Sequence, residues 1–139
     1  MPRLRDFTPS TLETYKGPRL HPTWNHGWFF ESRVWQFVIF LPRWLVKDDA
    51  REEICTAHDE RLLEELLQRD FGGCTSSLSP FRGIGYRGPQ VETNLHAQVI
   101  VLASRWRGTM RYFRALRKEL EASSGEERIL ILRQTLVIA

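Results

Sequence analysis

One apolar run, which fills both alternating positions of a strand, constrains this fold more than any other feature of the sequence. Residues 34–41 read Val-Trp-Gln-Phe-Val-Ile-Phe-Leu and are followed by Pro42. Because alternate side chains of a strand point to opposite faces, each face of this strand would be largely apolar. One set is Trp35, Phe37, Ile39 and Leu41, and the other is Val34, Val38 and Phe40. Such a run is typical of a central strand that is covered on both faces.

Two later segments have the periodicity of amphipathic helices. The first is expected from about Asp49 to Phe71, because Gly72-Gly73 follows and glycine readily ends a helix. The second is expected from Gly108 or Thr109 to Ser123. The buried stripes are Leu62, Leu63, Leu66 and Leu67 in the first helix and Met110, Phe113, Leu116 and Leu120 in the second.

Three further segments predict strands. Residues 95–105 alternate clearly, and residues 128–139 are predicted to form a strand that runs to the C-terminus. Residues 74–86 are interrupted by Pro80 and glycines, which indicates an edge strand. We expect residues 1–33 to form an irregular, aromatic arm that packs on the domain or on a partner subunit. Its anchors would include Trp24 and Trp28.

The order of elements, arm–β–α–β–β–α–β, resembles the ferredoxin-like sandwich and the dimeric α+β barrels built from it. The resemblance covers residues 34–139 and rests on the element order alone. It implies one α+β domain with a four-stranded antiparallel sheet and both helices on one face. Because this fold serves many unrelated functions, the resemblance implies no particular activity.

A sheet with helices on one face leaves its other face open. An apolar open face would be an aggregation hazard for a lone subunit, so something must cover it. We expect a homodimer or higher oligomer that binds a small apolar ligand or a protein partner through this face. Its contact residues would be Trp35, Phe37, Trp24 and Trp28.

His96 is the candidate for catalysis. It shares one set of its predicted strand with Gln98, a polar pair among apolar neighbours. In a small enzyme of the dimeric α+β-barrel kind, His96 could act as general base, assisted by Gln98 and by Tyr86 or Glu92. A hydrogen-bonded pair at a dimer interface is the structural alternative, and whether the chain is an enzyme stays open.

Basic residues gather between residues 105 and 118. On a helical wheel, Arg107, Arg111, Arg114 and Lys118 lie within about 60° of one another. The ridge could bind phosphates, which is a second alternative function. However, residues 47–70 carry a net charge of −5 and residues 82–118 a net of +7. We therefore expect the ridge to pair with Glu60, Glu64 and Glu65 of the first helix, and we do not expect nucleic acid as a partner.

Several classes of protein are excluded or disfavoured. No run approaches the roughly 20 apolar residues that span a bilayer, so we expect no membrane insertion. The two cysteines predict neither a zinc site nor a disulfide scaffold, which suits a cytoplasmic protein. Residues 83–88 have the glycine spacing of a dinucleotide-binding turn, but a strand follows in place of a helix. We therefore expect no cofactor and no metal.

Overall fold

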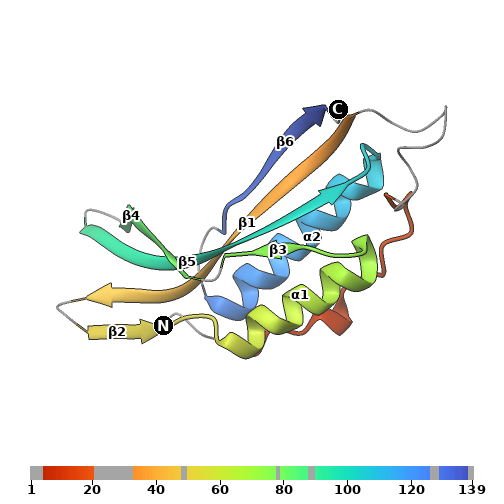
Figure 1. Ribbon diagram of the computed structural model, residues 1–139. Coiled ribbons are helices and arrows are strands. Elements are labelled where there is room, and N and C mark those ends of the chain that lie inside the picture. The colour runs from red at the N-terminus through yellow and green to blue at the C-terminus, as the bar shows by residue number, and fades with distance from the viewer. Residues whose placement is uncertain are drawn as a thin grey trace.

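The computed structural model describes residues 5–20, 33–47, 50–77, 79–87, 90–125 and 129–137. One short 3-10 helix, two α-helices and six strands are formed there. They are η1 (Pro9–Thr11), β1 (Arg33–Lys47), β2 (Ala50–Glu53), α1 (Ala57–Phe71), β3 (Thr75–Ser76), β4 (Phe81–Arg87), β5 (Gln90–Ala103), α2 (Arg107–Ser124) and β6 (Ile131–Val137). The predicted mixed α+β fold, with two helices and an antiparallel sheet, is confirmed (Figure 1).

Two long antiparallel strands, β1 and β5, form the centre of the sheet. They pair from Trp35 opposite Ala103 to Val46 opposite Thr93. Each has two shorter partners on its outer side, one for each half: β6 and β2 flank β1, and β3 and β4 flank β5. The sheet therefore has six strands, where the sequence predicted four.

Pro42 does not end β1 as the sequence predicted. The strand continues to Lys47 through a register shift between Pro42 and Trp44. A proline is tolerated at such a bulge because the missing N–H is not needed for the ladder there. The carbonyls of Pro42 and Arg43 accept hydrogen bonds from Cys55 and Ile54, so the chain folds back beside β1.

This return explains why α1 begins later than expected. Residues 50–53, predicted to be helical, pair with β1 as β2. The helix begins after Thr56, whose hydroxyl accepts from the Asp59 N–H while the Asp59 carboxylate accepts from the Thr56 N–H. Such a capping box satisfies two backbone donors at the helix start. The helix ends at Gly72, whose φ of 90° favours glycine.

The strand predicted over residues 74–86 is divided into β3 and β4. Pro80 lies immediately before β4, and proline cannot donate to a ladder. The two pieces still pair with the same strand, β5. α2 agrees closely with its predicted range and ends at Gly125, which has a φ of 78°.

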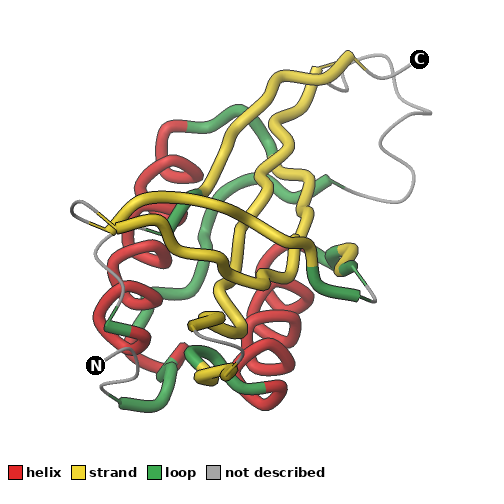
Figure 2. The backbone as a smooth tube through the Cα atoms, turned by 90° about the vertical axis from the view of Figure 1, so that its left-hand side faces the viewer, coloured by secondary structure: helices red, strands yellow, loops and turns green. Residues whose placement is uncertain are grey.

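Both helices lie on one side of the sheet (Figures 1 and 2). The core fills the space between the layers. The rings of Phe37 on β1 and Phe113 on α2 stack 3.8 Å apart with 12° between their planes. Fully buried aliphatic side chains surround them, namely Ile39, Leu41, Leu63, Leu67, Val99, Leu116 and Leu120.

Residues 5–20 pack on the helices. Phe7 and Tyr15 are buried, and the Tyr15 ring contacts Phe71 of α1 and Tyr112 of α2 at centroid distances of 4.5 and 5.8 Å. The predicted anchors Trp24 and Trp28 lie outside the described residues, and the division of the chain at residue 33 stays a prediction. Within the described ranges, no helix is long and apolar enough to cross a membrane.

Candidate binding site on the open sheet face

The face of the sheet turned away from the helices is uncharged along its centre. Residues that pair across strands share a face, which gives three rows on β5, β1 and β6. The rows are Gln98 and Phe40; Ile100, Val38 and Leu132; and Leu102, Gln36 and Gln134. Leu130 lies beside Phe40, because its carbonyl accepts from the Phe40 N–H. Leu102, Leu130 and Leu132 are 41–47% exposed, an unusual grouping for large apolar side chains.

The predicted contact residues of β1 lie on the opposite face. Phe37 is 2% exposed and belongs to the core, and the Arg133 guanidinium lies over the Trp35 ring at 4.7 Å. The helices therefore cover the set that begins with Trp35, and the set containing Val38 and Phe40 faces outward. Sequence alone could not choose between these sets, because both are apolar.

A pocket of about 320 Å³ opens on this face where β4, β5 and the segment before β6 meet. It is lined by Phe40, Pro42, Gly83, Ile84, Asn94, His96, Ile129 and Leu130. No acidic or basic side chain other than His96 is among these described residues. The pocket is small, apolar and has few polar groups, which is the usual composition of a ligand site.

The His96 imidazole is held between two phenyl rings. Its centroid is 5.2 Å from that of Phe40 and 6.0 Å from that of Phe81. Nδ1 lies 3.4 Å from Asn94 Oδ1, whereas Nε2 is buried without a hydrogen-bond partner among the described residues. Burial lowers the pKa of His96 below its ordinary value, so the ring is neutral at neutral pH.

The other predicted catalytic residues are not gathered at this pocket. Gln98 lies on the same face as His96, two residues along β5, and its backbone N–H bonds Ser77 Oγ. Tyr86 pairs with Val91 and Glu92 with Gly85, farther along the β4–β5 hairpin. At about 3.4 Å per residue, Val91 lies roughly 17 Å from His96 along the strand. The general-base hypothesis for His96 stays a prediction.

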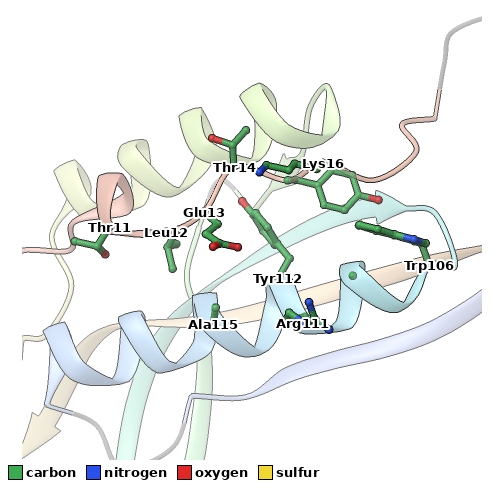
Figure 3. Close-up of a pocket in the computed structure, with 11 residues that line it drawn as sticks. Thr11, Leu12, Glu13, Thr14, Lys16, Trp106, Arg111, Tyr112 and Ala115 are labelled. Atoms are coloured by element: carbon green, nitrogen blue, oxygen red, sulfur yellow. The ribbon is translucent and has the colours of Figure 1, made fainter.

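A second pocket, of about 430 Å³, lies between the N-terminal segment and α2 (Figure 3). Its lining is Thr11, Leu12, Glu13, Thr14, Tyr15, Lys16, Trp106, Gly108, Arg111, Tyr112 and Ala115. The Tyr15 hydroxyl lies 3.0 Å from Thr109 Oγ1 and fixes the segment to α2. No pattern in the sequence pointed to this pocket, because its walls come from positions about 100 residues apart.

The basic ridge of α2 does not have the partners that the sequence predicted. Glu60 pairs with Arg43 of β1 at 3.6 Å, and Glu64 accepts a hydrogen bond of 2.7 Å from Ser76. Glu65 is exposed. The expected pairing between the two helices is therefore wrong: these glutamates face the sheet strands or the solvent. In the part of the chain that the structure describes, no ion pair involves Arg107, Arg111, Arg114 or Lys118.

The thiols are unsuited to nucleophilic work. Cys55 is buried, and burial, with a contribution from the Glu64 carboxylate, raises the pKa of Cys74. No cluster of three metal-ligating side chains occurs among the described residues.

Comparison of the sequence and fold with known proteins identified no relative. No protein-family model, curated protein or solved structure matches the chain.

Proposed function

We propose that this protein is a binding domain whose working surface is the open face of its sheet. A second copy of the chain covers that face and closes the His96 pocket into a chamber for a small apolar ligand. The observation that carries the proposal is the uncharged centre of the face, with three leucines 41–47% exposed. Burying such side chains is worth about 1.5–3 kcal/mol each when complete.

A second copy suits this face better than it suits the helix side. A two-fold interface places the same patch of both subunits in contact, so the patch must be complementary to itself. An apolar face with glutamine side chains meets that condition, because amides both donate and accept hydrogen bonds. The exposed side of α2, rich in arginine, would repel its own copy.

The topology supports the same arrangement. The strand order β6–β1–β5–β3, with α1 and α2 on one face, agrees with a ferredoxin-like domain extended by the β2 and β4 pairings. Dimeric α+β barrels join two such domains through their open sheets. In that arrangement the open faces of both copies become the walls of an enclosed space.

His96 gives the chamber one polar contact. If Asn94 Oδ1 accepts from Nδ1–H, Nε2 is left as a buried acceptor without a partner among the described residues, in a ring that lines an apolar cavity. A small ligand with an apolar body and one hydroxyl or N–H donor would fit these groups. Its donor would also satisfy a buried atom that now lacks a partner, which is worth about 1–3 kcal/mol.

Size-exclusion chromatography with light scattering tests the assembly. We expect a dimer at micromolar concentration that Leu132→Glu converts to a monomer, because the substitution places a charge in the centre of the interface. The matched control is Thr135→Glu, an exposed position of the same strand on its other face. A monomeric wild type, or a dimer that survives Leu132→Glu, overturns the proposal.

A further inference from the structure

The exposed side of α2 is a continuous cationic surface. Arg107, Arg111, Arg114 and Lys118 are all exposed and follow one another at intervals of three or four residues. At about 1.5 Å per residue, they extend over roughly 16 Å of the helix. Like charges at these spacings destabilise a helix by about 0.2–0.5 kcal/mol per pair. An anionic partner outside the described chain would offset this repulsion.

The second pocket adjoins this surface at Arg111. Arg111 belongs to both, and Lys16 reaches the pocket from the N-terminal segment on the opposite wall (Figure 3). Leu12, Ala115 and the ring of Tyr112 supply the apolar part of the lining. Exposed cations thus adjoin a largely apolar pocket of about 430 Å³.

Glu13 adds a specific acceptor. Its side chain extends into the space between the N-terminal segment and α2 (Figure 3). A carboxylate at the edge of a base accepts hydrogen bonds from an exocyclic amino group, as acidic side chains do with cytosine. A purely cationic pocket would bind phosphate but could not recognise a base in this way.

We propose that this side of the molecule binds single-stranded nucleic acid. The phosphates lie along Arg107, Arg111, Arg114 and Lys118, and one unstacked base enters the pocket beside Glu13 and Tyr112. Arginine suits phosphate because its guanidinium forms two parallel hydrogen bonds. Duplex strands keep their bases stacked inside and would leave the pocket empty, whereas splayed bases are what single strands offer to such pockets.

The first test measures fluorescence anisotropy of a labelled single-stranded oligonucleotide of mixed sequence. We expect binding at about 50 mM salt, with a log–log salt slope of about −0.7 for each phosphate contact. The triple variant R111Q/R114Q/K118Q should lose at least about tenfold in affinity and flatten that slope by about 2. The control R51Q/R61Q/R82Q removes the same charge at exposed positions outside α2 and should change the slope little.

The second test separates the pocket from the charge. Ala115→Phe fills the pocket and should weaken binding several-fold with an unchanged salt slope, whereas Ala122→Phe, exposed on the same helix outside the pocket, should not. Circular dichroism verifies that each variant is folded. The proposal is overturned if the oligonucleotide does not bind at about 50 mM salt, or if the two triple variants lose affinity equally. It is also overturned if the protein binds a duplex or polyglutamate as tightly as it binds the single strand. These outcomes are independent of the oligomeric state, so the proposed sheet interface is tested separately.

Discussion

The phenol of Tyr112 donates a hydrogen bond of 2.7 Å to the fully buried carboxylate of Asp70. This contact joins α2 to α1, and Arg69 adds two hydrogen bonds of 2.9 and 3.0 Å to the same carboxylate. Burial and the neighbouring carboxylate both raise the pKa of Tyr112, so its proton stays in place as the donor. The two helices are thus tied by a charge-assisted bond on the side that carries the N-terminal segment.

Tyr112→Phe should lower the free energy of unfolding by about 2 kcal/mol, because hydrogen bonds to charged groups contribute about 1.5–3 kcal/mol. Urea unfolding at neutral pH measures the change. Tyr15→Phe is the matched control, since among the described residues its hydroxyl bonds two neutral groups, the Pro18 carbonyl and Thr109, and should cost about 1 kcal/mol. A Tyr112→Phe cost no greater than that of the control would contradict the role given to Asp70.

The fold was predictable where local signals and the global structure agree. The leucine stripe and glycine stop of α1 both appear in the structure, and so does α2 nearly in full. The start of α1 was also readable in principle, since Thr56 and Asp59 have the spacing of a capping box. The pairing of residues 50–53 with β1 could not be predicted from the sequence. These residues are polar and compatible with a helix, and contacts with β1 that are distant from the local pattern make them a strand.

The candidate sites were less predictable for a similar reason. Alternation placed His96 and Gln98 on one face of a strand, as the register shows. It could not tell whether Phe37 or Phe40 faces the helices, since a one-residue shift exchanges the two faces. The second pocket depends on Tyr15 docking between Phe71 and Tyr112, and long-range contacts of this kind leave no periodic signal.

A second prediction concerns the stability of the fold at acidic pH. Arg5 donates two hydrogen bonds, of 2.6 and 2.7 Å, to the Glu119 carboxylate. Burial alone would raise the pKa of Glu119, but the bonds from Arg5 and from the Thr8 N–H lower it below its ordinary value of 4.5. A lowered pKa in the folded state stabilises the fold above 4.5, and this contribution is lost as the pH falls through the folded value.

Urea unfolding over a series of pH values checks this sign. The difference in unfolding free energy between wild type and Glu119→Gln should be constant above pH 4.5 and shrink below it. Glu65→Gln, at an exposed position on α1, is the control for the removal of one carboxylate elsewhere in the chain. If the difference between wild type and the Glu119→Gln variant grows in acid, the pKa of Glu119 is raised instead.

A third prediction tests how the N-terminal segment docks. A side chain at Gly17 would overlap Cε3 and Cζ3 of Trp106 and the hydroxyl of Tyr15, so the backbone lies directly against both side chains. Gly17→Ala should therefore cost about 1–3 kcal/mol through overpacking. In a Trp106→Leu background the overlap with the indole is removed and the overlap with the Tyr15 hydroxyl is left, so the same substitution should cost less, with a coupling of at least about 0.5 kcal/mol. Additive costs in this cycle would mean that Gly17 and Trp106 do not touch.

The last prediction concerns how much the buried imidazole of His96 lowers the stability of the fold. His96 Nε2 is buried without a partner among the described residues, and burial lowers the pKa of the ring. His96→Leu should raise the free energy of unfolding by about 1 kcal/mol, since an unsatisfied buried group costs about 1–3 kcal/mol. Because the unfolded chain binds the proton more tightly, wild-type stability should also fall as the pH drops below 6.5, and the leucine variant should lack this component. The exposed His58 is the control, and His58→Leu should not raise the free energy of unfolding. A His96→Leu variant less stable than wild type would mean that the imidazole supports the fold, in which case the pocket is a packing feature and not a site kept at a cost for a ligand.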